Sequence, residues 1–203
     1  MGLKPFDATN YRIEYIPQRL ISLEACVIGC HTVLSNKMHT PLTLHLGSST
    51  LCQPDLSLFV GLTIDAGLVA NRTLLNFLGI KLANGALTNE SYALTIENFS
   101  LSLVSINDAC RVLEPDVPSP NMRQIWVEAL NTASKSVAHL TEAGSTIRVA
   151  RLGFACFATS RLLRERFFRA TSTPEPPTIL PADVVPGFGG VWDAVDPALN
   201  VLL

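Results

Sequence analysis

Hydrophobic residues recur with helical spacing along four long segments of this chain. In Asp55–Leu82, apolar side chains cover almost the whole circumference of the predicted helix, and only a narrow seam of Asp65, Arg72 and Asn76 is polar. In Asn121–Leu140 the apolar positions form a single stripe instead. The first pattern is typical of a helix buried on most sides, and the second of a helix that covers a core with one face.

Two further helices are predicted over Gln18–Asn36 and Ile147–Ala170. Pro17 suits the first turn of the earlier one. Between the helices, Leu42–Leu46 alternates apolar and polar residues and could form a short strand, and Asn84-Gly85 predicts a turn.

These segments predict an all-α fold, an irregular bundle of four to five helices. We expect the helical domain to occupy residues 17–170, after an irregular lead-in over residues 1–16. An extended, Pro- and Gly-rich tail follows over residues 171–203 and carries four acids and no base. The apolar fraction of 48% and the charged fraction of 16% are typical of a globular chain with a substantial core.

The longest apolar runs are too short or too interrupted for a membrane-spanning helix, which needs roughly 20 apolar residues. Glu24 and His31 interrupt Leu20–Leu34, and Asp65 interrupts Ser57–Ala70. We therefore expect no integral membrane segment. The five cysteines are odd in number and mostly lie in apolar segments, which favours reduced thiols and a cytoplasmic location.

Arg72 is the first candidate for a functional residue, because a charge on a buried helix needs a partner. Either it forms a structural ion pair with Asp65, or its fork of donors binds an anion such as phosphate. Asn131, Lys135 and His139 lie on one strip of the predicted helix that carries them, opposite its apolar stripe. That strip is either solvated or covered by a neighbour, and in the second case His139 would be placed to act as a general base.

A second candidate is the basic face of the last predicted helix. A row of arginines attracts phosphate backbones, so this face is a candidate for anion or nucleic-acid binding. It could equally be a solvated face, or one neutralised by the acidic tail. Its members are Arg148, Arg151, Arg166 and Arg169.

The sequence predicts no metal site and no cofactor. Cys26 and Cys30 are followed by His31, but no second cysteine pair has the spacing of metal ligands. Because their surroundings are apolar, we expect packed thiols.

Two segments resemble the signature segments of uncharacterised bacterial all-helical proteins. One is Arg72-Thr-Leu-Leu-Asn-Phe-Leu78, and the other runs from Asn131 through Lys135 to Ala138-His139-Leu140-Thr141. Such proteins are loosely similar to HEPN domains, some of which are metal-independent RNases of defence and toxin–antitoxin systems. The resemblance implies a helical fold and a catalytic pair of Arg72 and His139, although HEPN nucleases carry their Arg and His on one helix.

Three functions remain open at this stage. The first is a cytoplasmic helical protein that acts by assembly, as a homo-oligomer or with a protein partner, for example within a bacterial defence or toxin–antitoxin system. The second is a metal-independent, HEPN-like RNase in which Arg72 stabilises phosphate charge and His139 transfers protons. The third is a peripheral membrane protein, which is suggested by the positive mean hydropathy of +0.31.

Overall fold

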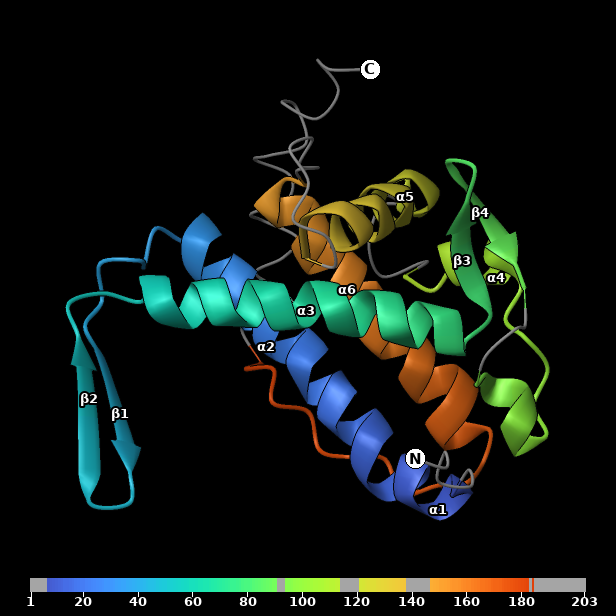
Figure 1. Ribbon diagram of the computed structural model, residues 1–203, viewed down its shortest axis with the longest axis horizontal. Coiled ribbons are helices and arrows are strands. Elements are labelled where there is room, and N and C mark those ends of the chain that lie inside the picture. Colours follow the sequence, from blue (N-terminus) through green and yellow to red (C-terminus); the bar gives the residue numbers. More distant parts are fainter. Residues whose placement is uncertain (1–6, 91–93, 114–120, 138–146, 183, 185–203) are drawn as a thin grey trace, which may run out of the picture.

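Three long helices cross at the centre of this computed structural model, and a fourth packs against them (Figure 1). The structure describes residues 7–90, 94–113, 121–137, 147–182 and 184. For residues 136 and 137 it describes the backbone alone. Helix α2 contacts both α3 and α6, and α5 packs on α3 and α6. Their bounds are Ile16–Leu34 for α2, Ser57–Phe77 for α3, Met122–Thr132 for α5 and Val149–Leu163 for α6.

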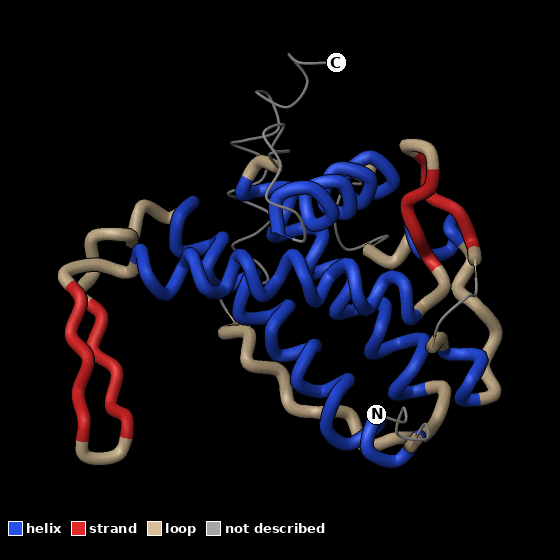
Figure 2. Tube along the Cα trace, viewed as in Figure 1, coloured by secondary structure: helices blue, strands red, loops and turns tan. Residues whose placement is uncertain are grey.

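The fold is mostly helical, but the all-α prediction is wrong in its strict form because two antiparallel hairpins are present (Figure 2). The first pairs β1 (Leu42–Leu46) with β2 (Ser49–Gln53), and the second pairs β3 (Ile80–Ala83) with β4 (Ala86–Asn89). The short strand predicted at Leu42–Leu46 is confirmed as β1.

The first strand of the second hairpin, β3, includes residues 80–82, which were predicted to form the last turn of the long central helix. Helix α3 stops at Phe77, because Gly79 adopts a φ of +86°, a conformation that a helix does not accommodate. The turn predicted at Asn84-Gly85 is confirmed, since both residues have positive φ (51° and 78°) as a tight hairpin turn requires. The apolar pattern therefore continues past the end of the helix into a strand.

The predicted irregular lead-in is also wrong where the structure describes it. Asp7 caps a helical segment: its Oδ1 accepts hydrogen bonds from the backbone N–H groups of Thr9 and Asn10 (2.9 and 3.2 Å). Helix α1 (Ala8–Asn10) and a wider π-helical turn (Tyr11–Tyr15) then lead without a break into α2.

Close packing of α2 against α3 depends on two glycines. A Cβ placed on Gly67 would lie 2.2 Å from the Cβ and 2.4 Å from the Sγ of Cys26, and one on Gly29 would lie 2.4 Å from Thr63 Oγ1. Such distances are far below van der Waals contact, so only glycine allows the two backbones to approach this closely.

A buried chain of hydrogen bonds ties α5 and α6 to α3. Trp126 donates through Nε1 to Thr159 Oγ1 (3.1 Å), and Thr159 donates to Asn71 Oδ1 (2.7 Å). All three residues have essentially no exposed surface. Because a buried polar group is costly without a partner, this chain fixes how the three helices meet.

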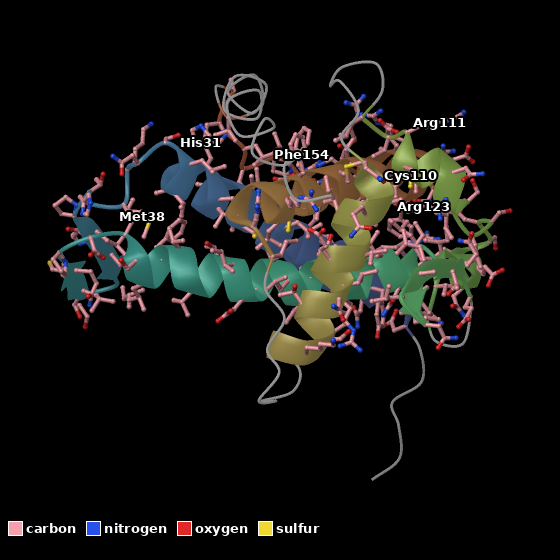
Figure 3. The ribbon with its side chains drawn as sticks, turned by 90° about the horizontal axis from the view of Figure 1, so that it is seen from above. His31, Met38, Cys110, Arg111, Arg123 and Phe154 are labelled. Carbon is pink, nitrogen blue, oxygen red and sulfur yellow. The ribbon has the colours of Figure 1, made fainter. Side chains whose placement is uncertain are left out.

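Shorter elements close one end of the bundle. A 3₁₀ turn (Ile96–Phe99) precedes α4 (Ile106–Cys110), and Arg123 of α5 donates from Nη2 to Asn107 Oδ1 (3.1 Å). Figure 3 shows Cys110, Arg111 and Arg123 together at this end. The predicted helix over Asn121–Leu140 begins with Asn121 as its N-cap and widens into a π-helical turn (Ala133–Val137), and its last three residues lie outside the described part of the chain.

The first part of the C-terminal tail docks on its own chain. After α6 and a π-helical segment (Arg164–Arg169), residues 174–180 are extended, and Thr178 and Ile179 contact Glu24 of α2. We call residues 174–180 the strap. Residues 185–203 lie outside the described part of the chain.

Candidate functional site

A pocket of about 530 Å³ opens beside Arg72. Its walls come from the N-terminal helical segment, from α2, from one face of α3, and from single residues before the 3₁₀ turn and after α5. We call it the Arg72 pocket. The described residues that line it are Tyr11, Tyr15, Ile16, Arg19, Val69, Arg72, Thr73, Leu74, Asn76, Phe77, Leu94 and Ala133.

Arg72 is half-buried, and its guanidinium forms no hydrogen bond or ion pair with any residue that the structure describes. The proposed ion pair with Asp65 is absent, although both residues are described. Asp65 is exposed and lies two helical turns before Arg72. The third seam residue, Asn76, is half-buried and lines the same pocket.

The end of α5 lies next to the seam. A smaller cavity of about 110 Å³ adjoins the pocket, and Arg72 and Asn76 line it together with Lys81, Glu90 and Ser134. Arg72 is therefore close to the part of the chain that leads to His139.

The residues of the strip predicted at Asn131, Lys135 and His139 differ in how far they are buried. Asn131 is half-buried, Lys135 is exposed, and His139 lies outside the described residues. The pair of Arg72 and His139 accordingly stays a prediction.

The basic face predicted on the last helix is partly neutralised. Arg151 forms an ion pair with Glu128 of α5, and Arg169 lies 3.7 Å from the carboxylate of Glu175 in the strap. Arg148 and Arg166 are exposed. The acid at 175 belongs to the predicted acidic tail, so the tail does meet arginines of its own chain.

The most deeply buried carboxylate among the described residues was not predicted as part of a site. Glu24 is 1% exposed, and its Oε1 accepts from Arg164 (Nη2 at 2.7 Å, Nε at 3.2 Å) and from Ser160 Oγ (3.0 Å). Its Oε2 accepts from Thr178 Oγ1 (3.1 Å) and from the Ile179 N–H (2.9 Å). The signal was present in the sequence, because Glu24 is the only acid in the run Leu20–Leu34.

Arg164 completes this cluster with two further contacts. Its Nη1 donates to Glu175 Oε1 (2.8 Å) and to the Pro176 carbonyl (2.7 Å). Burial alone would lower the pKa of Arg164, but the hydrogen bonds that it donates to Glu175 and Glu24 outweigh this effect and raise that pKa above its ordinary value. Arg164 therefore stays charged, and its contacts hold the strap to α2 and α6.

Three buried thiols meet where α2 and α3 cross. The sulfurs of Cys26 and Cys30 are 4.0 Å apart, and Cys156 donates to the Gly67 carbonyl (3.8 Å). A hydrogen bond with Cys156 raises the pKa of Cys26 well above its ordinary value, and one with Cys26 does the same for Cys30. All three thiols are free and buried, as the packed-thiol interpretation predicts for Cys26 and Cys30. Within the described ranges, no group of three or more His, Cys, Asp and Glu side chains could hold a metal ion.

A different kind of surface lies on the first hairpin, which projects away from the helical body (Figure 1). Leu44 faces Leu51 across the two strands, and alternation places Leu42 and Leu46 on the same side. Leu46 is 66% exposed, and Leu44 and Leu51 are each 37% exposed. We call residues 42–53 the leucine arm.

Helix α3 is the one helix, among the residues that the structure describes, with the length and apolar composition of a membrane span. About 44% of the relevant window is buried inside the protein, and a core helix passes the same test. This observation is weak evidence for a span.

Comparison with known proteins gave no relative. No protein family, no curated protein and no solved structure matches this chain. The likeness to HEPN domains therefore stays a prediction from two short segments.

Proposed function

We propose that this protein acts by assembly, as a dimer in which two copies meet through the leucine arm and the adjoining start of α3. The observation that carries the proposal is an amphipathic hairpin whose leucine face is exposed in the part of the chain that the structure describes. A two-stranded hairpin alone in water is at best marginally stable. Burial of its leucines against another surface would contribute the missing stability.

The apolar surface continues from the arm onto α3. Helix α3 begins four residues after β2 ends, and its Leu58 and Leu62 are one turn apart and 40% and 63% exposed. The base of the arm is fixed to the body, because the Leu56 N–H donates to the Met38 carbonyl (2.9 Å; Met38 is labelled in Figure 3). A fixed arm with an apolar face is suited to a defined interface.

The charge on this surface favours a second copy over a nucleic acid or an anionic membrane. Residues 42–70 contain no Lys and no Arg, and their only acids are Asp55 and Asp65. Phosphate-rich partners need basic contacts, which this surface lacks. A two-fold dimer places the same patch on both sides of the interface, and an apolar patch with few charges does not repel itself.

The test compares two lysine variants at neighbouring positions of β1. Leu44 lies on the leucine face, whereas Thr43 lies on the opposite, polar face and is also exposed. We expect the full chain to sediment as a dimer that dissociates on dilution. Leu44→Lys should weaken dimerisation at least tenfold, because a charge would be buried in the interface, and Thr43→Lys should leave it unchanged.

Three results would contradict the proposal. They are a monomer at every concentration, equal effects of Leu44→Lys and Thr43→Lys, or a monomer that co-sediments with neutral phosphatidylcholine vesicles through Leu44. The last result would favour the peripheral membrane alternative. Circular dichroism of each variant establishes that the helical body is intact.

A further inference from the structure

We infer that the Arg72 pocket binds a small amphipathic anion, with an apolar body against α3 and a carboxylate or similar head on the guanidiniums of Arg72 and Arg19. The pocket lies along the same side of α3 as Leu58 and Leu62 but two to four turns further toward the C-terminal end of that helix, beyond the start of α3 that the proposed dimer uses. The inference rests on the pocket's size, its walls and the state of its charges.

The walls supply an apolar enclosure of suitable size. Ligand pockets for small organic molecules measure roughly 300–1,000 Å³, and this one measures about 530 Å³. Ile16, Leu74 and Phe77 are each at most 5% exposed and form part of the core. Because α2, α3 and the buried chain of hydrogen bonds hold them in place, these walls are preformed, which lowers the cost of ordering a bound ligand.

The charges facing the pocket are of one sign. Arg72 comes from α3 and Arg19 from α2, and neither guanidinium is hydrogen-bonded or ion-paired to any described residue. No Asp or Glu is among the described residues that line the pocket. Glu90 is exposed and lines the smaller adjoining cavity. A carboxylate would give Arg72 the charged partner that the described part of the chain does not provide.

Two tyrosines and an asparagine of the pocket lining carry polar groups that can form hydrogen bonds to a ligand. The rings of Tyr11 and Tyr15 are 5.1 Å apart, and Tyr15 is 50% exposed. Asn76 lies one turn after Arg72 on the same face of α3 and can donate to an anionic head. The apolar interior distinguishes this pocket from a phosphate-backbone groove, which would carry basic residues along its length.

The test uses three probes below their micellar concentrations: dodecanoate, dodecyltrimethylammonium and a single-stranded oligoribonucleotide. Isothermal titration calorimetry should detect dodecanoate, and it should detect the cation of equal chain length at least tenfold more weakly. Arg72→Met should weaken dodecanoate binding at least tenfold, because methionine retains apolar length without the charge. Arg166→Met, which removes an exposed arginine of the last helical segment, is the matched control and should leave binding unchanged.

A second variant separates loss of binding from loss of fold. Val69 lines the pocket and is 36% exposed, so Val69→Glu places an acid beside the ligand with little disturbance of the core. It should also abolish dodecanoate binding while circular dichroism stays unchanged. Equal binding of the two dodecyl probes, no effect of Arg72→Met, or displacement of dodecanoate by the oligoribonucleotide at lower concentration would each overturn the inference.

Discussion

Arg164 and Arg72 are both half-buried arginines on the helical core, yet their surroundings differ completely. Arg164 donates to Glu24, Glu175 and the Pro176 carbonyl, and the strap closes over it. Arg72 meets no described partner and faces a pocket. A buried charge whose partners are all within the chain serves the fold, whereas one whose partners are missing is available to a ligand.

The largest effect is expected from the enclosed cluster. Glu24→Gln removes the buried one of the two carboxylates that pair with Arg164, and it should lower the free energy of unfolding by about 3–5 kcal/mol, the usual cost of breaking a buried pair. Arg72→Met should change that free energy by less than about 0.5 kcal/mol, because Arg72 has no hydrogen-bond or ion-pair partner among the described residues. Urea unfolding followed by circular dichroism measures both.

The double variant Glu24→Met with Arg164→Met provides the control for this pair. It removes both charges and fills the space with apolar atoms, so it should be more stable than either single variant. If Glu24→Gln and Arg72→Met lowered the free energy of unfolding equally, the proposed difference between a paired Arg164 and an unpaired Arg72 would be wrong.

A second prediction compares the packed and the open side of α3. Gly67→Ala forces a methyl group onto Cys26 and should cost about 1–3 kcal/mol through overpacking. A Cβ on Gly61 of the same helix meets no atom within 4 Å, so Gly61→Ala should stabilise the protein by about 0.5–1 kcal/mol through helix propensity. Thermal unfolding should shift in opposite directions, and a shift of the same sign in both variants would contradict the close crossing of α2 and α3.

A third prediction concerns the stability of the folded protein at alkaline pH. The folded protein retains the protons of Cys26 and Cys30 at a pH where the unfolded chain, with thiol pKa values near 9.0, releases them. The unfolded state then binds fewer protons, so stability is full below about pH 9 and falls as the pH rises further, by about 1.4 kcal/mol per pH unit for each thiol.

Two alanine variants isolate the contribution of these thiols. Cys26→Ala with Cys30→Ala should flatten the slope of unfolding free energy between pH 9 and pH 10.5, whatever its effect at pH 7. Cys52→Ala removes an exposed thiol of the leucine arm and should leave the slope as it is. Identical slopes in all three proteins would refute the role of the buried pair.

The sequence predicts those features of the fold that neighbouring residues determine, and it misses those that depend on contacts between distant segments. Helices α2, α3 and α6 follow from apolar periodicity, and the turn at Asn84-Gly85 follows from residues that accept positive φ. The end of α3 near Gly79 follows from a glycine that accepts positive φ, but strand β3 was missed because it continues the same apolar run. The N-terminal helix was missed as well, since its support comes from packing on α2 and from the cap at Asp7.

The site shows the same division. The sequence by itself determined the helical periodicity, and it marked Arg72 as a charge within an apolar helix. Only the tertiary structure decided which arginine has an acidic partner. Glu24 pairs with Arg164 because the crossing of α2 and α6 brings these two residues together, whereas Arg72 has no partner among the described residues. Charge pairing acts over a few ångströms in space, and spacing along the chain does not fix that distance once the chain has turned back on itself.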